Sequence, residues 1–422
     1  MSNFPPPGFA PGKSQVAGIE VYLPITKSTE KRPDVMDFKC PKCGATITYS
    51  VDAGQLVCEH CGYSETPEGQ LLGRGAEQFE FDINVLLRSQ QGWGSERKDM
   101  ACQRCGAVVS MPPDTLAYTC PFCASNKVLY REPMEDVLRP RFLIPFKINP
   151  QNCHEIALRW LGSSWLLPKE LRTAAVGKFT PIYIPYWTFD AVANATWQAR
   201  VAVERTEEIY LEGEEQQYTK TIWRDESGKA QKAFSGLLVP GTTRLNMSAL
   251  GKMDNFNLSD LILYEPRFLV GMQAQSYDLP LEAAWDTGRL VLRERTRRAC
   301  LDRASATNMR DFRMSLDFSD EQWRYILVPV YTSVYQYGEN TYQILVNGQT
   351  GKIAGPRPVD WLKLWLVVAA ILSPGILTEI ASLFNQGTDA GDFLAGFGIF
   401  LLATGLVFTY FLLRQAMEME NV

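Results

Sequence analysis

The chain has 422 residues, a formal net charge of −5 and charged residues at 21% of its length. At about 100–200 residues per domain, it is long enough for several compact units. An acidic chain lacks the basic face that a dedicated nucleic-acid binder turns toward phosphates, so that class is disfavoured. Residues 1–35, rich in proline, glycine and charge, are predicted to be a flexible leader, and Met1–Val16 has no apolar segment typical of a secretory signal.

Cysteine spacing is the most specific signal in the sequence. Eight of the ten cysteines form four Cys-x2-Cys pairs, which suits metal chelation in a reducing compartment better than a disulfide framework. The second set of two pairs repeats the first after 62 residues, and 14 residues separate the inner cysteines in both sets. This spacing predicts two zinc ribbons, whose ligands are Cys40, Cys43, Cys58 and Cys61 in the first and Cys102, Cys105, Cys120 and Cys123 in the second.

Each ribbon is expected to hold one structural Zn²⁺, with iron as the minor alternative. Four thiolates leave no open coordination position for a catalytic water, so hydrolytic zinc chemistry is not expected. His60 lies between Cys58 and Cys61, in the tight turn (knuckle) that a Cys-x2-Cys pair forms. It is not expected to be a ligand, because four cysteines already complete the metal site. Glycine follows three of the four pairs and allows a sharp turn there, whereas Ala124 follows the fourth. The predicted boundaries are 36–66 and 99–131, joined by a linker at 67–98 that contains a strand at Phe79–Ile83.

Residues 132–360 are aromatic and β-branched and predict a β-rich α+β domain. Helical patterns cover Asn152–Leu166 and the arginine-rich Leu281–Ala304. Asn347–Gly351 has the composition of a turn between antiparallel strands. The two runs Tyr183–Val203 and Tyr325–Val346 begin with similar sequences, and each contains a polar break typical of a hairpin. They predict an internal duplication of a β-unit.

Three segments of this domain combine proline with apolar and aromatic residues. They are Leu143–Phe146, Tyr183–Trp187 and Leu327–Tyr331. Because proline has no N–H to donate to a β-ladder, it belongs on an edge strand or at a bulge. The sequence therefore predicts edge or bulge positions for these prolines.

The end of the chain predicts a transmembrane helical hairpin at 361–414, followed by a tail at 415–422. Leu362–Phe384 and Phe393–Leu413 are long apolar runs, and a spanning helix needs about 20 such residues. The loop between them is acidic, whereas lysine and arginine flank the outer ends of both runs. The positive-inside rule then places both termini in the cytoplasm and the chain in the inner membrane. The alternative is a buried helical hairpin in a globular core.

No constellation in the sequence favours an enzyme. The phosphate-loop, serine-elbow and zinc-protease motifs are absent from it. Cys153 and His154 are adjacent, but neighbours on a helix point about 100° apart and do not face one another. Cys153 and Cys300 are therefore interpreted as ordinary thiols.

The chain resembles bacterial membrane proteins described as TFIIB-type or replication-factor-Y-like zinc-ribbon proteins, with YdjG-like members. The resemblance rests on the tandem ribbons with Cys120–Cys123, and on Leu143–Ile148, Ile184–Ala191 and Val346–Lys352. With the terminal hairpin it covers nearly all of the chain beyond the leader. None of these segments is similar to a helicase motor motif. The resemblance implies a membrane anchor for stomatin/flotillin-like (SPFH) or phage-shock-type partners.

The expected function is therefore a non-catalytic adaptor that recruits protein partners to the membrane. Two alternatives stay open. A membrane-tethered nucleic-acid-binding protein would use Lys127, Arg131 and the Arg293–Arg298 cluster. An accessory subunit of a membrane enzyme or transporter would draw on Glu379, the single acidic residue of the first apolar run.

Overall fold

The structure is a computed structural model that describes residues 9–12, 21–24, 39–67, 72–73, 79–80, 93, 97–112, 119–131, 138–211, 214–253, 255–306 and 308–421. Most of the predicted leader and linker lies outside these residues. Within the leader, β1 (Phe9–Gly12) pairs antiparallel with β2 (Val21–Pro24). Within the linker, β6 (Phe79–Glu80) falls in the segment predicted as a strand.

A mixed sheet of 12 strands, counted over the described residues, forms the centre of the molecule. Three long strands dominate it: β11 (Thr180–Leu211), β12 (Glu214–Pro240) and β15 (Met309–Tyr337). β11 lies between the other two and pairs antiparallel with both. The shorter strands are β6, β7 (Lys98–Cys102), β8 (Val108–Met111), β9 (Val128–Arg131), β10 (Phe142–Leu143), β13 (Ile262–Leu263), β14 (Gln273–Gln275), β16 (Asn340–Asn347) and β17 (Ile353–Ala354).

Both faces of this sheet are buried, because its central strands are apolar on both sides. Tyr183 and Trp187 pack into one cluster, and the alternate residues Ile182, Ile184 and Tyr186 pack into the other. The first cluster also receives α2 (Pro150–Leu161), α4 (Leu281–Leu301) and the base of the C-terminal hairpin. The second receives α3 (Met247–Met253) and the second cysteine cluster. Short 3₁₀ helices, η2 (Lys169–Thr173), η3 (Leu258–Asp260) and η4 (Pro266–Leu269), connect these elements.

The predicted helices of this domain are confirmed with shifted ends. α2 begins at Pro150, in the first-turn position where a missing N–H is harmless, and stops before Gly162 rather than at Leu166. α4 covers the arginine-rich segment as far as Leu301. The predicted turn at 347–351 is also confirmed, because Asn347 Oδ1 accepts hydrogen bonds from the N–H groups of Gln349 and Thr350 between β16 and β17.

The edge-strand prediction for Pro185 and Pro329 is wrong, because both lie within the paired central strands β11 and β15. On one side of each proline the neighbouring strand changes, and the proline lies in the gap where one strand pairing ends and the next begins. β11 pairs with β14 up to Tyr183 and with β12 from Tyr186, and β15 pairs with β10 up to Leu327 and with β16 from Val330. The missing N–H therefore falls where no ladder needs it.

The first of the two runs does not contain the predicted hairpin. Tyr183–Val203 continues as part of the uninterrupted β11, whose hairpin with β12 comes after Leu211. The second run does turn back, from β15 into β16 around Gly338. The two similar segments instead pair directly with each other, with Pro185 opposite Leu327 and Tyr183 opposite Pro329.

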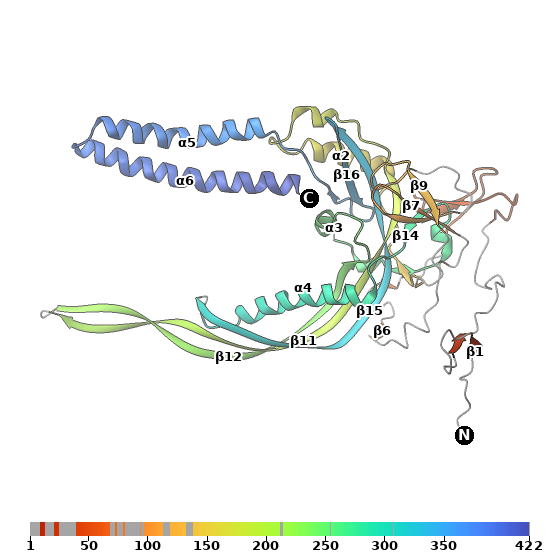
Figure 1. Cartoon of the computed structure of the whole chain (residues 1–422), viewed down its shortest axis with the longest axis horizontal. Helices are drawn as coiled ribbons and strands as arrows, with labels where there is room; N and C mark the ends of the chain where they lie inside the picture. Colours follow the sequence, from red (N-terminus) through yellow and green to blue (C-terminus); the bar gives the residue numbers. More distant parts are fainter. Residues whose placement is uncertain are drawn as a thin grey trace, which may run out of the picture.

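Beyond the core, β11, β12 and β15 continue as a three-stranded arm (Figure 1). The 21 residues of β11 after Asp190 are long enough for about 70 Å. Helix α4 covers one face near the base of the arm, where Ala195, Trp197 and Cys300 form a small apolar cluster. The outer edge of β12 carries no ladder with another described strand.

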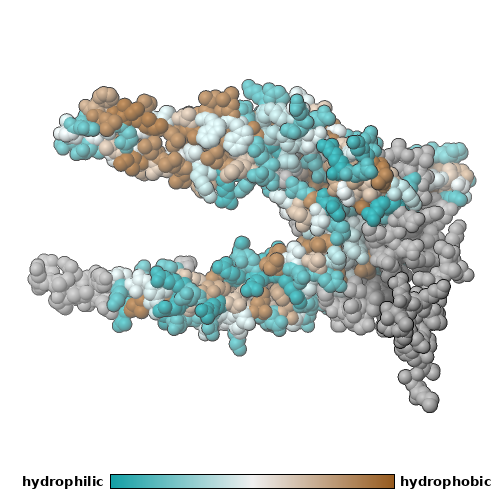
Figure 2. Space-filling view, in the orientation of Figure 1, coloured by the Kyte–Doolittle hydropathy of each residue, from teal (hydrophilic) through white to brown (hydrophobic). Residues whose placement is uncertain are grey.

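The C-terminal segment forms two antiparallel helices, α5 (Trp361–Phe384) and α6 (Asp389–Glu420), that project from the core (Figure 1). Both are long and apolar enough to cross a membrane, and only 17% of the most apolar window of each is buried. Their contact surface is rich in small residues, with Gly375 and Ser382 of α5 and Gly391, Gly398 and Gly405 of α6 all buried. Large apolar side chains point outward instead, as the brown surface in Figure 2 shows.

Candidate metal centres

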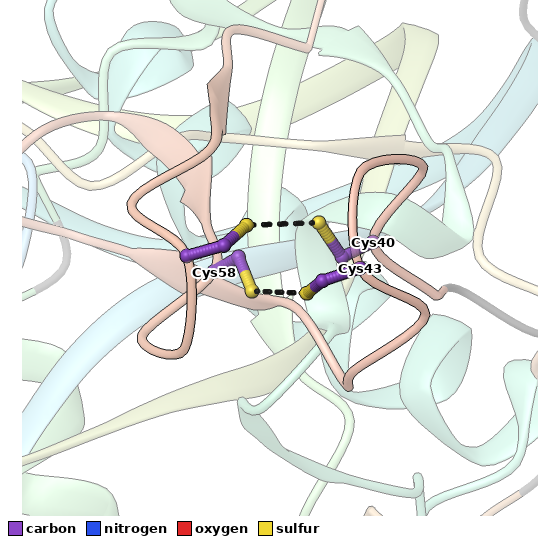
Figure 3. Close-up of side chains that lie close together, drawn as sticks. Cys40, Cys43 and Cys58 are labelled. Atoms are coloured by element: carbon purple, nitrogen blue, oxygen red, sulfur yellow. Dashed lines mark hydrogen bonds between the residues drawn. The ribbon is translucent and has the colours of Figure 1, made fainter.

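The first cysteine cluster is formed by two knuckle loops that face each other. Cys40 and Cys43 come from the loop before β3 (Thr48–Ser50), and Cys58 and Cys61 follow β4 (Gln55–Val57). Their sulfurs converge, as Figure 3 shows for Cys40, Cys43 and Cys58. The Sγ–Sγ distance is 3.5 Å between Cys40 and Cys61 and 3.6 Å between Cys43 and Cys58.

The second cluster repeats this geometry closely. The Sγ–Sγ distance is 3.5 Å between Cys102 and Cys123 and 3.6 Å between Cys105 and Cys120. In both clusters all four sulfurs lie within 4.8 Å of one another. All eight cysteines predicted as metal ligands are thus brought together in the two predicted sets.

These distances fit a tetrahedral metal rather than disulfides. A disulfide bond is about 2.05 Å long, far shorter than the separations of 3.5 and 3.6 Å. Four thiolates bound at about 2.3 Å in a tetrahedron lie roughly 3.8 Å apart. Both clusters can therefore hold a metal ion, and four sulfur ligands would leave it no open position.

Backbone donors favour the thiolate form at particular cysteines of each cluster, whereas the pKa is raised at others such as Cys43 and Cys105. Burial opposes ionisation of Cys40, but the backbone N–H groups of Lys42 and Cys43 donate to its sulfur and lower its pKa to about 7. In the second cluster, backbone N–H groups of Cys105 and Arg104 likewise overcome burial and lower the pKa of Cys102 to about 7. Such donors stabilise the thiolate form that binds metal.

The residue after the second cysteine of each knuckle adopts a left-handed backbone conformation. φ is +73° at Gly44, +71° at Gly62 and +73° at Gly106, and it is +55° at Ala124. Glycine adopts this conformation freely, whereas a Cβ atom makes it unfavourable by about 1–2 kcal/mol. The glycines are thus explained by local geometry, and Ala124 is a strained exception.

This strain gives a test within one ribbon. We expect Ala124→Gly to stabilise the second ribbon by about 0.5–1 kcal/mol, because relief of the left-handed strain exceeds the added freedom of the unfolded chain. Gly106→Ala should destabilise the same ribbon by about 1–2 kcal/mol. Competition with a metal chelator measures both, and equal chelator midpoints for the two variants would contradict the assignment.

The two ribbons are attached to the core differently. The first forms its own three-stranded sheet of β3, β4 and β5 (Ser64–Glu65) and docks on η4. The Tyr49 N–H donates to Val270 O at 2.9 Å, and the Tyr49 ring contacts Phe268 edge-on. The Arg267–Glu65 ion pair closes this contact at 3.3 Å.

Strands β7, β8 and β9 of the second ribbon belong to the central sheet. β8 pairs with β14, which in turn pairs with β11. The buried Arg97 guanidinium donates to the carbonyls of Ser110, Leu269 and Met272, and Thr332 Oγ1 donates to Pro121 O at 2.7 Å. The second cysteine cluster is therefore packed against the core of the domain.

The remaining cysteines are isolated thiols. Cys153 and Cys300 are fully buried, and burial raises the pKa of Cys153 to about 12. His154 is exposed, on a different side of α2 from Cys153. A nucleophilic cysteine needs a lowered pKa and access to substrate. Cys153 and Cys300 are buried and their pKa values are raised, so neither fits this role.

Two functional features were missed by sequence reasoning. Gly391, Gly398 and Gly405 recur every seven residues along α6, a spacing that was visible in the sequence and marks a helix contact surface. A cavity at the base of the α5–α6 hairpin combines Arg357 with Lys252 from distant segments, and spacing alone gives no signal for it.

Comparison with known proteins shows similarity to a distant relative. Over 332 residues, which are 77% of this chain and 91% of the relative, the sequence is 24% identical to a Bacillus subtilis protein described as uncharacterized protein YdjG. No known family profile matches the chain. No solved structure matches it. The similarity supports the YdjG-like part of the resemblance, and the TFIIB-type description stays a prediction.

Proposed function

We propose that this protein is a non-catalytic, membrane-anchored adaptor whose two zinc-binding ribbons and projecting arm recruit protein partners at the cytoplasmic face. The observation that carries the proposal is the reversed packing of the α5–α6 hairpin. Glycines lie at the contact between its helices and most of its large apolar residues face outward, as in helices packed within lipid. Leu377 and Phe400, for example, are 63% and 61% exposed.

The exposed surface of this hairpin disfavours the alternative that it is a buried helical hairpin in a globular core. A soluble helical hairpin hides its large apolar residues, and contiguous exposed patches of this size mark binding or membrane surfaces. α5 alone is about 36 Å long, enough for a hydrocarbon core of roughly 30 Å. The acidic residues Asp389 and Asp392 lie in the first turn of α6, at the end of the hairpin opposite Lys363 and Arg414. By the positive-inside rule, the core and the ribbons then lie in the cytoplasm.

The arginines of α4 are better explained by structure than by nucleic acid. Arg289 pairs with Glu321 at 3.3 Å, and Glu294 forms ion pairs with both Arg297 and Arg298. Paired guanidinium groups offer less net charge to a phosphate backbone. We therefore favour a protein partner over DNA or RNA.

The proposal is tested by affinity capture from solubilised membranes. Wild-type protein should retain specific membrane or cytosolic proteins, and the Cys58→Ser variant should lose those that dock on the first ribbon. SPFH- or phage-shock-type proteins are the partners that the resemblance suggests. Equal sets of captured proteins for wild type and Cys58→Ser would contradict docking on the first ribbon. Capture of nucleic acid that is sensitive to salt would contradict the choice of a protein partner.

Membrane insertion constrains the arm. The arm and the α5–α6 hairpin project from the core in the same direction, with open space between them, and the arm is largely polar (Figures 1 and 2). A polar arm with open strand edges cannot lie in hydrocarbon. We infer that the arm swings aside in the membrane, at the level where β11 forms bulges with both neighbours and Gly236 and Asp320 have positive φ.

A spin label on the arm checks this inference. We expect a nitroxide at Val203→Cys to be accessible to a water-soluble relaxation agent in lipid nanodiscs, because Val203 lies on the arm beyond α4. The same label at Phe400→Cys on α6 should be accessible to oxygen instead. The two native cysteines outside the metal clusters are fully buried and should not react. Lipid-like accessibility at Val203 would contradict the inference.

A further inference from the structure

A cavity lies at the base of the α5–α6 hairpin, where the last turn of α6 meets the core. Its volume is about 420 Å³. The last turn of α2 supplies Trp160, and the loop after it supplies Ser163. The segment after β17 supplies Arg357, α3 supplies Lys252, and Glu418 comes from α6. These elements are far apart in the sequence and converge only in the folded chain.

Two cations in this cavity lack a carboxylate partner among the described residues. Arg357 is half-buried, and its Nη1 donates to Trp160 O at 3.0 Å and Ser163 Oγ at 2.9 Å. The guanidinium lies 4.6 Å above the Trp160 ring, which fixes its plane. Lys252 Nζ donates to the backbone carbonyl of Glu418 at 3.1 Å. Neither cation forms a salt bridge with a described residue.

Glu418, the acidic residue that lines the cavity, is already paired with a cation. Arg414 Nε lies 3.0 Å from Glu418 Oε1 in an i, i+4 ion pair. The cavity therefore carries an excess of positive charge. Burial lowers the pKa of Arg357, so the charged form is partly desolvated and gains from a bound anion.

The cavity is placed at the level of lipid headgroups. Arg414 ends the apolar run of α6, and Glu418 is one turn further, about 6 Å toward the core. The headgroup region extends roughly 5–7 Å beyond the hydrocarbon on each side. Three tryptophans surround the same level, with Trp165 49%, Trp361 37% and Trp365 54% exposed. Tryptophan is enriched at this depth in membrane proteins.

We propose that this cavity binds the phosphate group of an anionic phospholipid from the inner leaflet, with Arg357 and Lys252 as its ligands. The planar guanidinium can donate two hydrogen bonds to phosphate oxygens, and the ammonium group adds a second charge. The exposed tryptophans then lie beside the bound lipid at the membrane–water interface. The inference rests on the proposed membrane anchoring and goes beyond it, because it specifies a lipid class.

The test uses full-length protein in nanodiscs of phosphatidylglycerol and phosphatidylcholine in equal amounts. After transfer to a zwitterionic detergent, native mass spectrometry counts the lipids retained per chain. Wild type should retain one phosphatidylglycerol in preference to phosphatidylcholine. Lys252→Gln should reduce this retention about tenfold, the effect of one charged hydrogen bond, and Arg357→Gln should reduce it at least as much. Arg357→Lys should restore part of it.

Matched controls separate this site from the anchor. Arg298→Gln removes an exposed cation of α4 and should retain lipid like wild type. All variants should stay in the membrane pellet after alkaline carbonate washing; if they do not, the anchoring proposal fails rather than the lipid site. Equal retention of both lipids by wild type, or unchanged retention in both Gln variants, would overturn the inference. Displacement of the lipid by millimolar inorganic phosphate would assign the cavity to a soluble phosphate and overturn the lipid assignment.

Discussion

Loss of a ligand in the second cysteine cluster is expected to spread into the central sheet, whereas loss of one in the first cluster is expected to stay local. Structural zinc contributes about 10–16 kcal/mol in small zinc-binding peptides, comparable with the total stability of a domain at about 5–15 kcal/mol. Cys120→Ser should therefore unfold β7, β8 and β9. Because β8 pairs with β14 and β14 with β11, the loss should spread into the central sheet.

Hydrogen–deuterium exchange on the full-length protein separates the two cases. In Cys120→Ser, protection should fall in 97–131 and also in β14 and the Ile182–Tyr186 segment of β11. In the matched variant Cys58→Ser, it should fall only in 39–67 and at the η4 contact with Tyr49. Each variant should lose one of two zinc ions. Exchange confined to the ribbon in both variants would show that the second centre is an independent module.

The second large effect is expected at the contact between α5 and α6. A Cβ atom at Gly398 would lie 2.8 Å from Glu379 Oε1 and 2.9 Å from Thr378 Oγ1. Gly398→Leu should therefore push the helices apart. Overpacking of this kind typically destabilises by about 1–3 kcal/mol, which lowers Tm by roughly 2–10 °C for a domain of this size. Thermal unfolding in nanodiscs measures the change.

Gly396, two residues away, provides the control. Nothing lies within 4 Å of a Cβ atom at this position, which is exposed on the outer side of the hairpin. Gly396→Leu should leave Tm unchanged and keep the protein in the membrane. If Gly396→Leu were as destabilising as Gly398→Leu, the outer face would be packed against protein rather than lipid.

The two four-cysteine clusters could be predicted from the sequence because their geometry is local. A Cys-x2-Cys pair places two sulfurs on one tight turn, and 14 intervening residues suffice for a short hairpin that brings back the second pair. The apolar helices were equally visible, since their length and composition alone determine them. The same local logic explains the knuckle glycines and the strain at Ala124.

Features that depend on pairing between distant segments could not be predicted. Pro185 was expected at a sheet edge, but the strand beside it changes from β14 to β12 at that point, and only the folded topology reveals this. The length of β11 was missed because polar residues on the arm, such as the partly exposed Asn194 and the exposed Gln198, resemble a turn in the sequence. The cavity site of Arg357 depends on Lys252 and Trp160, which are about 100 and 200 residues away in the sequence.

The metal content of the membrane-bound protein tests the membrane anchor and the two metal centres most directly. Membranes containing the full-length protein are washed with alkaline carbonate, the protein is solubilised and purified without chelator, and zinc is measured per chain. We predict that the protein stays in the washed membranes and carries two zinc ions per chain. Release by carbonate would contradict the anchor, and well under two zinc ions per chain would contradict the two metal centres.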